Sequence, residues 1–154
     1  RPFTGDFAGD ILYSALERRG LAEGVYAKRV DDGFRLIDVR ISNAVRCVPP
    51  ENKPEPVEIK TCNGFLASEI AAMPNLRVIL SLGSISHAAV LRTLGVKAKD
   101  AVFGHAAEHR LEVAGRSLVL LDSYHTSRYN IQTRRLTPAM FDAIILRAKA
   151  LLAA

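Results

Sequence analysis

The sequence contains no tryptophan and only two cysteines among its 154 residues. Two cysteines are too few for a small secreted scaffold held together by disulfides, so we expect an intracellular protein with reduced thiols. Uninterrupted apolar runs such as residues 118–121 are far shorter than the roughly 20 residues that a membrane span needs. The sequence therefore favours neither a disulfide-rich nor a membrane-spanning protein, and we expect no membrane among its partners.

Several local catalytic signatures are also missing. The sequence has no GxGxxG, Walker lysine loop, GxSxG elbow or HExxH, so kinase, dinucleotide-binding and zinc-protease functions have no local support. It begins RPFTGDFAG without a methionine, in a turn-rich segment, and we expect further sequence upstream of Arg1. The hydrophobic content of 49% excludes a disordered tail. We therefore predict one domain over residues 1–154, incomplete at its N-terminus.

The charge that is present is basic and comes mostly from arginine. The formal net charge is +5, and arginine outnumbers lysine 15 to 6. Residues 123–140 contain three arginines and two tyrosines but no acidic residue. These are Arg128, Arg134, Arg135, Tyr124 and Tyr129. The pattern indicates either a solvated arginine-rich surface or a nucleic-acid interface, because guanidinium groups match phosphates and base edges.

Helical and strand-like apolar periods alternate along the chain. Apolar residues at helical spacing over residues 9–19, stopped by Gly20, predict the first helix. Thr137 and Pro138 predict the N-cap and first residue of a last helix that runs to the C-terminus. The other expected elements are strands at 36–42, 77–82 and 117–121, a helix at 57–72, and a helix from an N-cap at Ser84 or Ser86 to Gly95. This alternation predicts an α/β fold, a three-layer α/β/α sandwich around a short, mostly parallel sheet.

Ligands bind at the carboxyl ends of the strands in such a sheet. The polar residues that follow the expected strands are Asn43, residues 84–86 and residues 122–125. We expect all of them on one edge of the sheet. The residues alone thus predict a site at this edge that contains Asn43 and His125.

The cysteines and the other histidines leave alternatives open. Cys47 and Cys62 are either two free thiols or metal ligands, and two thiolates alone are too few for a structural zinc or an iron–sulfur cluster, each of which takes four ligands. His87 lies among alanines and a valine, which favours a structural role. His105 and His109 belong to a glycine- and alanine-rich stretch, where we expect a surface loop.

Three residues have the chemistry to act on a substrate. His125 follows an expected buried strand and opens a polar loop, where it could donate a hydrogen bond to a leaving group that develops negative charge. Asp6 either caps the first helix or positions a water molecule or faces a cationic transition state. Phe3 is either a core anchor or an exposed stacking platform.

Segments from three parts of the chain resemble motifs of the uracil-DNA glycosylase superfamily. The resemblance is strongest to its iron–sulfur-containing family 5, and next to family 4. The matching segments are residues 1–9 (RPFTGDFAG), residues 41–54 (ISNAVRCVPPENKP), and residues 123–130 (SYHTSRYN) with residues 133–137 (TRRLT). The resemblance runs nearly end to end, and it implies the uracil-DNA glycosylase fold without its first strand.

The resemblance also implies roles for individual residues. Phe3 would stack on a uracil flipped out of the duplex, which needs a new π-face once it leaves its neighbours. Asn43 would read the uracil edge, because its amide both donates and accepts hydrogen bonds. His125 would stabilise the departing uracil anion. Asp6 would position the attacking water or stabilise the oxocarbenium-like sugar.

The third motif implies the contacts with DNA. Ser127, Arg128 and Arg135 would bind DNA, and the two arginines would hold phosphates or enter the gap that base flipping leaves. Two positions depart from the family pattern. Thr126 replaces the proline that is common after the loop histidine, and Arg134 stands where the family usually has glycine. A glycine there indicates a backbone requirement.

The resemblance finally implies a cofactor and a reaction. Cys47 and Cys62 would be two of four thiolate ligands of a [4Fe–4S] cluster, with the other two upstream of Arg1. The protein would be a monomeric, nucleoid-associated cytoplasmic enzyme that hydrolyses uracil, and other deaminated bases, from DNA to leave an abasic site. The alternative is a relative that captures uracil-DNA without turnover or by cross-linking. Such relatives carry a basic loop that residues 103–110 (FGHAAEHR) lack, so we favour the enzyme.

Overall fold

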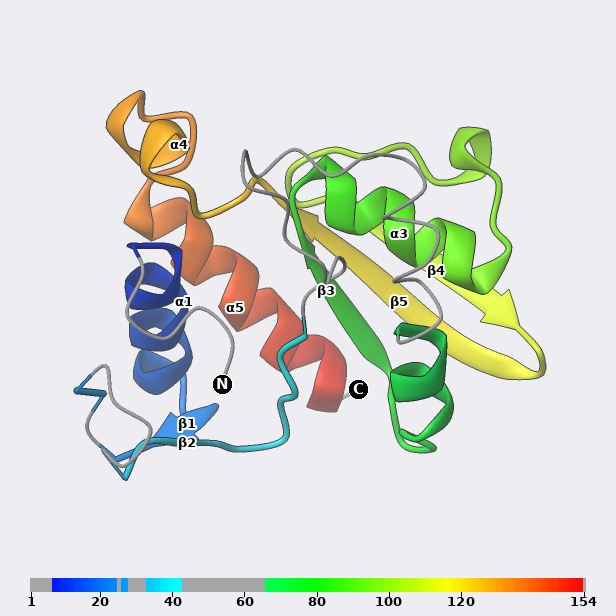
Figure 1. The fold of residues 1–154 in the computed structure, drawn as a ribbon, viewed down its shortest axis with the longest axis horizontal. Helices are drawn as coiled ribbons and strands as arrows, with labels where there is room; N and C mark the ends of the chain where they lie inside the picture. Colours follow the sequence, from blue (N-terminus) through cyan, green and yellow to red (C-terminus); the bar gives the residue numbers. More distant parts are fainter. Residues whose placement is uncertain (1–6, 25, 28–32, 43–65, 154) are drawn as a thin grey trace. The chain divides into compact units, whose positions relative to one another are not determined.

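The computed structural model describes residues 7–24, 26–27, 33–42 and 66–153 (Figure 1). The chain divides into two compact units, which we describe separately. The first unit comprises Arg1–Ile41 and Tyr124–Ala154, and the second comprises Ser42–Ser123. Helices and a β-sheet occur together in this arrangement, which confirms the predicted α/β class.

The first unit is built around two helices, α1 (Phe7–Arg18) and α5 (Pro138–Ala153), which contact each other. Their apolar faces supply most of the buried side chains of this unit. The buried members on the two helices are Leu12, Tyr13, Ala15, Leu16, Phe141, Ile144, Ile145, Ala148 and Leu151. The helix predicted at residues 9–19 is confirmed as α1, which begins two residues earlier.

The ends of these helices are fixed by the residues that the sequence indicates. At the end of α1, Gly20 has a φ of 75°, and the Leu21 amide donates to the Leu16 carbonyl at 2.9 Å. A left-handed residue with this backward hydrogen bond is the usual glycine stop of a helix. At the start of α5, the Met140 amide donates to the Thr137 hydroxyl at 3.1 Å. The predicted stop and cap are therefore confirmed.

An ion-pair group ties α5 to the end of α1. Arg18 and Arg19 each contact the Asp142 carboxylate, at 3.0 and 2.8 Å. Burial acts to raise the pKa of Asp142, but the hydrogen bonds and charges of the two arginines outweigh it and hold that pKa below its ordinary value. Lys149 adds a hydrogen bond to the Arg19 carbonyl at 2.8 Å.

A short antiparallel ribbon completes the described part of this unit. Strand β1 (Ala22–Glu23) pairs with β2 (Arg35–Leu36). We predicted a strand over residues 36–42, and this was wrong, because the structure ends β2 at Leu36. The physical reason is Asp38, whose φ of 57° lies in the left-handed region and interrupts an extended run.

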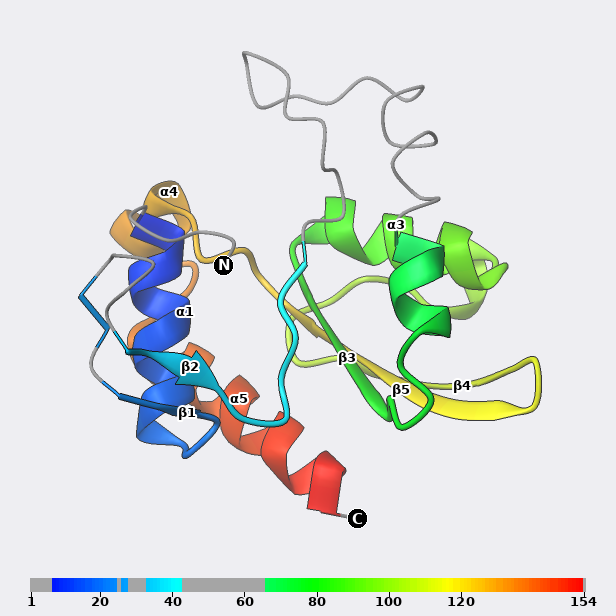
Figure 2. The same ribbon diagram turned by 60° about the horizontal axis from the view of Figure 1, so that its bottom comes forward.

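The second unit contains a three-stranded sheet with the order β3-β5-β4 (Figures 1 and 2). Strands β3 (Val78–Leu82) and β5 (Arg116–Ser123) are parallel, while β4 (Glu108–Val113) is antiparallel to β5. The sheet of the described residues is thus mixed. The strands predicted at 77–82 and 117–121 are confirmed, whereas the sequence did not predict β4.

Helix α3 (Ser84–Leu94) packs against β3 and covers one face of this sheet, as both ribbon views show. Val90 and Leu91 of the helix form a core cluster with Ala101 and with Leu120 of β5. The predicted helix ends as expected at Gly95, which has a φ of 71°. Of the helix predicted at residues 57–72, residues 66–71 are helical, and residues 57–65 lie outside the described residues.

The start of α3 differs from our prediction. Neither Ser84 nor Ser86 is the N-cap, because Gly83 holds that position with a φ of 95°, and the Ser86 hydroxyl donates to the Leu82 carbonyl at 3.2 Å. The Gly83 amide also donates to the Ser123 carbonyl at 2.8 Å, which joins the carboxyl ends of two parallel strands. The polar residues after β3 and at the end of β5 therefore share one edge of the sheet, as predicted.

Candidate nucleic-acid interface

Five of the predicted site residues lie outside the described residues, so their predicted roles stay predictions. They are Phe3, Asp6, Asn43, Cys47 and Cys62. The third motif is described over residues 124–137, and it includes the short helix α4 (Arg128–Gln132). The candidate site is built from this segment.

Three internal hydrogen bonds shape the segment. The backbone amide of Asn130 donates to the Ser127 hydroxyl at 3.2 Å, so Ser127 is the N-cap of α4. The Asn130 side chain donates to the His125 carbonyl at 2.9 Å. The Leu136 amide donates to the Asn130 carbonyl at 3.0 Å, and the Leu136 side chain is fully buried. Asn130 therefore fixes the backbone at His125 and closes the loop onto its apolar anchor.

Thr126 ties the same segment to the first turn of α1. Its side chain is buried, and its hydroxyl donates to the Ala8 carbonyl at 3.3 Å. The proline that is common at this position in the resembling family has no group that could donate this bond. The departure at Thr126 thus adds a contact inside the first unit.

Arg134 has a φ of 59°, in the left-handed region that L-residues seldom adopt. This is the position where the resembling family usually has glycine. A glycine at this position indicates that the backbone has to be left-handed. The backbone here is left-handed, and Arg134 adopts that conformation although it is not a glycine. Its exposed side chain adds a positive charge beside Arg135.

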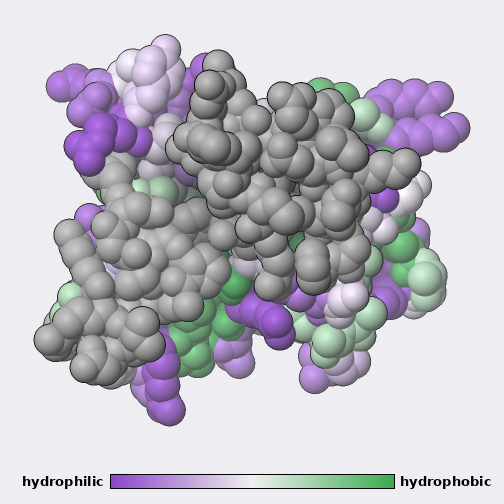
Figure 3. Space-filling model, viewed as in Figure 1, coloured by the Kyte–Doolittle hydropathy of each residue, from purple (hydrophilic) through white to green (hydrophobic). Residues whose placement is uncertain are grey.

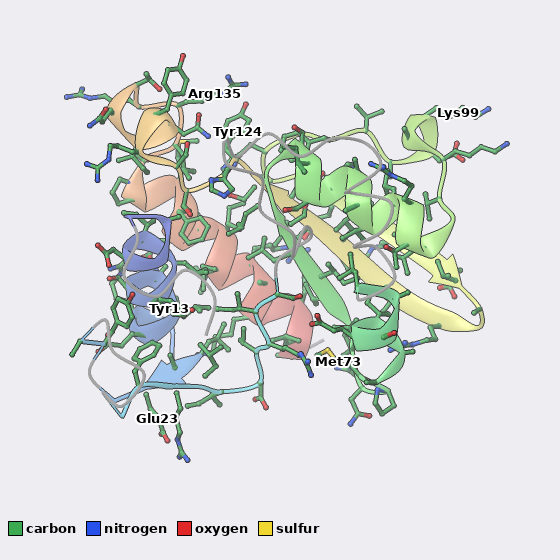
Figure 4. All side chains as sticks on the ribbon, in the orientation of Figure 1. Tyr13, Glu23, Met73, Lys99, Tyr124 and Arg135 are labelled. Carbon is green, nitrogen blue, oxygen red and sulfur yellow. The ribbon has the colours of Figure 1, made fainter. Side chains whose placement is uncertain are left out.

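Cationic and aromatic side chains gather on the surface of this segment. Arg128, Arg134 and Arg135 are exposed, and Tyr129 is 70% exposed. The surface over α4 is mostly hydrophilic, at the upper left of Figure 3. The Arg135 guanidinium carbon lies 4.8 Å from the ring centroid of Tyr124, and Figure 4 labels both residues. Such a surface can bind phosphates and offer faces on which bases stack.

These charges could be located from the sequence, but the contacts that hold them could not. We predicted a polar loop after His125, whereas Arg128–Gln132 is a helix. We predicted no role for Asn130, which organises the loop. A signal for this helix was present in the sequence, because serine is a preferred N-cap residue and Ser127 directly precedes Arg128–Gln132.

A second polar cluster lies in the other unit, on the sheet. His87 Nδ1 is 2.7 Å from Asp122 Oδ1, and His109 Nε2 is 2.8 Å from Asp122 Oδ2. The structural role predicted for His87 agrees with its burial, but the surface loop predicted for His109 was wrong, because His109 belongs to β4 and is largely buried. His105 does lie in the preceding loop, and partial burial lowers its pKa.

Known proteins that are similar to this chain include uracil-DNA glycosylases of two types. A Type-5 uracil-DNA glycosylase of Thermus thermophilus is 42% identical over 151 residues, covering 98% of this chain and 67% of the relative. The Type-5 protein of Mycobacterium tuberculosis is 40% identical over 153 residues, covering 98% and 56%. A Type-4 uracil-DNA glycosylase of Pyrobaculum aerophilum is 32% identical over 126 residues, covering 81% and 57%.

The chain therefore spans about half to two thirds of the length of these curated relatives. Within the described residues, no helix is long and apolar enough to cross a membrane. Residues 1–149 match the family described as the Uracil DNA glycosylase superfamily. Together with relatives at about 40% identity over nearly the whole chain, this match shows that the chain belongs to the uracil-DNA glycosylase superfamily.

Proposed function

We propose that this chain is the glycosylase part of a family 5 uracil-DNA glycosylase. It removes uracil, and other deaminated bases, from DNA and leaves an abasic site, acting as a monomer on the nucleoid in the cytoplasm. The observation that carries the proposal is the folded third motif, in which Asn130 fixes the His125 backbone beside a surface with three exposed arginines. The similarity to Type-5 enzymes supports the same activity.

In this proposal, the reaction breaks the bond between the base and the sugar, which leaves negative charge on uracil and positive charge on the sugar. His125 donates a hydrogen bond to the uracil carbonyl oxygen nearest the sugar, and so stabilises the anion. Asp6 orients the attacking water or stabilises the oxocarbenium-like sugar. Phe3 stacks on the flipped base, and Asn43 binds its polar edge.

The DNA backbone is held by the third motif. Arg128 and Arg135 contact phosphates, where their guanidinium forks form charge-assisted hydrogen bonds. The Ser127 hydroxyl accepts from the Asn130 amide. A hydroxyl also carries one proton of its own, so Ser127 can donate to a phosphate oxygen while it caps α4. Its cap role and its DNA contact are therefore compatible.

A [4Fe–4S] cluster is the cofactor that this proposal includes. Thiolates are the ligands that such clusters prefer, and the two cysteines of the chain supply two of the four that a cluster takes. Cys47 and Cys62 would hold it, and its place in the protein would be structural. Iron content and visible absorbance of Cys47→Ser and Cys62→Ser variants would test this assignment, since each variant should lose both signals.

The test of the activity uses the full-length protein and an end-labelled DNA duplex with a single uracil. Alkali converts each abasic site into a strand break, which a denaturing gel measures. We expect cleavage by the parent protein and a loss of at least about 100-fold in Asp6→Asn and in His125→Gln, because each removes a group that acts on the transition state. His105→Gln serves as the matched histidine control and should keep the parent rate.

The same gel separates the alternative function. A protein that captures uracil-DNA without turnover would give no alkali-labile sites, and a cross-linking relative would give a protein–DNA adduct that survives denaturation. Either result would contradict the glycosylase proposal. Unchanged cleavage by the Asp6→Asn/His125→Gln double variant would instead contradict the assigned chemistry.

A further inference from the structure

Two histidines and an aspartate from three different elements converge in the second unit. His87 comes from α3, His109 from β4 and Asp122 from β5. Their three ligand-capable atoms lie within 4.8 Å of one another. The Asp122 side chain is fully buried, and those of His87 and His109 are 6% and 13% exposed. A buried carboxylate flanked by two imidazoles requires a specific partner for its charge.

The hydrogen-bonding partners of His87 define its protonation. Its Nε2 lies 2.7 Å from the Ala101 carbonyl oxygen, which can only accept, so Nε2 carries a proton. Its Nδ1 lies 2.7 Å from Asp122 Oδ1, which is a second acceptor. A neutral imidazole has one N–H, and its other nitrogen is a lone pair. The lone pair of a neutral His87 would therefore face a carboxylate oxygen, so this contact needs either a second proton on the imidazole or a metal ion bound by both groups.

The surroundings of the cluster match those of a metal site. Histidines that bind metals usually donate their other N–H to a carbonyl or carboxylate, and ligating carboxylates are themselves hydrogen-bonded. His87 donates to the Ala101 carbonyl, and the Ser81 hydroxyl donates to Asp122 Oδ1 at 2.8 Å. The Gly104 amide faces Asp122 Oδ2 at a longer 3.5 Å. Both kinds of supporting contact are thus present.

The sheet holds two of the three groups in register. His109 is paired with Leu120 in the ladder between β4 and β5, two residues from Asp122 along the strand. Strand β4 is at the edge of the three-stranded sheet of the described residues, next to β5. A metal ion with bonds of about 2.0–2.1 Å needs its ligand atoms farther apart than these contacts of 2.7 and 2.8 Å, so metal binding requires both histidines to move slightly away from Asp122.

We propose that His87, His109 and Asp122 form a binding site for a divalent transition metal ion, with zinc as the best match. His87 binds through Nδ1, His109 through Nε2, and Asp122 through its carboxylate. Two imidazoles and one carboxylate suit zinc or a similar ion, whereas calcium and magnesium require mostly oxygen ligands. Water completes the coordination on the side where His109 is partly exposed. The proposal does not depend on the proposed glycosylase function.

The test measures zinc binding to the full-length protein after treatment with a chelator. Equilibrium dialysis against zinc chloride, with the metal quantified by mass spectrometry, compares the parent with His109→Gln and His105→Gln. Glutamine at position 109 can still donate to Asp122, so it preserves the hydrogen bond while it removes the imidazole. His105→Gln, in the adjacent loop, is the matched control.

We expect the parent and His105→Gln to bind one zinc more per chain than His109→Gln. Zinc at roughly 100 times its Kd should also raise the Tm of the parent by about 5 °C or more, and leave that of His109→Gln unchanged. Equal zinc content in the parent and His109→Gln, or no zinc in either, would overturn the proposal. Those results would make the cluster a hydrogen-bonded network held by protons.

Cobalt(II) provides a readout that separates this site from cysteine ligands. Cobalt bound to nitrogen and oxygen gives weak visible bands, whereas thiolate ligands add intense charge-transfer absorption. A Cys47→Ser/Cys62→Ser variant should keep the weak bands, and His109→Gln should lose them. Bands that follow the cysteines and not His109 would contradict the proposed ligands.

Discussion

At the scale of single residues, the surface charge and the backbone conformation at Arg134 favour different residue types. Its φ of 59° is a conformation in which an L-residue places Cβ too close to its own carbonyl. Glycine, the usual family residue, avoids that contact. The arginine keeps an exposed positive charge on the candidate interface in return. Charge and backbone strain at this position can be separated by two substitutions.

We expect Arg134→Gly to be more stable than Arg134→Ala by about 1 kcal/mol, because both lose the charge and only alanine keeps the left-handed penalty. Unfolding by urea, followed by circular dichroism, measures the difference. Arg128→Gly and Arg128→Ala are the control pair, since position 128 is helical. There the order should reverse, with glycine less stable. The same order at both positions would contradict a strained Arg134.

Single residues also show what the sequence could not reveal about the candidate site. The arginines and His125 could be identified as candidates because their chemistry is written in their residue types. The role of Asn130 could not, since it arises from bonds to His125 and Leu136 that form only when the chain folds. Likewise, nothing in the sequence pairs His87 with His109, which are 22 positions apart but both contact Asp122 and have ring centroids 5.4 Å apart.

At the scale of secondary-structure elements, α5 depends on its first residues. The Thr137 hydroxyl accepts a hydrogen bond from the Met140 amide, which otherwise has no partner within the helix. We expect Thr137→Ala to lower the free energy of unfolding by about 1 kcal/mol, and Thr137→Ser to retain most of it, because serine is an equally good cap. Midpoints of chemical denaturation of the three proteins provide the measurement. A Thr137→Ser variant as unstable as Thr137→Ala would assign the effect to the lost methyl group.

The glycine stops at Gly20 and Gly95 and the cap at Thr137 were predictable because each acts within a few residues, whereas the predicted cap of α3 was wrong, since Gly83 holds that position. Strand β4 was not predicted, although its sequence EHRLEV has an alternating pattern in which His109, Leu111 and Val113 are the less exposed residues. The glycines and alanines just before it favoured a loop, and its pairing with β5 is a tertiary contact. The strand predicted at 36–42 failed for the opposite reason, because its alternating pattern continued past a left-handed Asp38.

At the scale of the whole molecule, the sequence gives the fold class from alternation alone, but not the arrangement of its strands. Both α3 and β4 lie between β3 and β5 in the chain. The chain passes through α3 into β4, which is antiparallel to β5, and the turn after β4 reverses it again, so β5 runs parallel to β3. The antiparallel β4 required knowledge of the turn at residues 114–115, where Ala114 and Gly115 both have positive φ. The net charge of +5, in contrast, is a property of the whole chain that the sequence fixes outright.

That net charge raises the question of whether DNA is attracted by the protein as a whole or by the third motif. Each phosphate contact contributes about 0.9 to the slope of log affinity against log salt. We expect Arg128→Gln to reduce the slope by about 0.9 for a uracil-free duplex, because the proposed function places Arg128 on a phosphate. Arg92→Gln removes the same charge from an exposed position on α3, and should leave the slope near the parent value. Fluorescence anisotropy of a labelled duplex over a series of sodium chloride concentrations gives all three slopes. Equal reductions in the two variants would mean that the overall charge, and not the third motif, binds DNA.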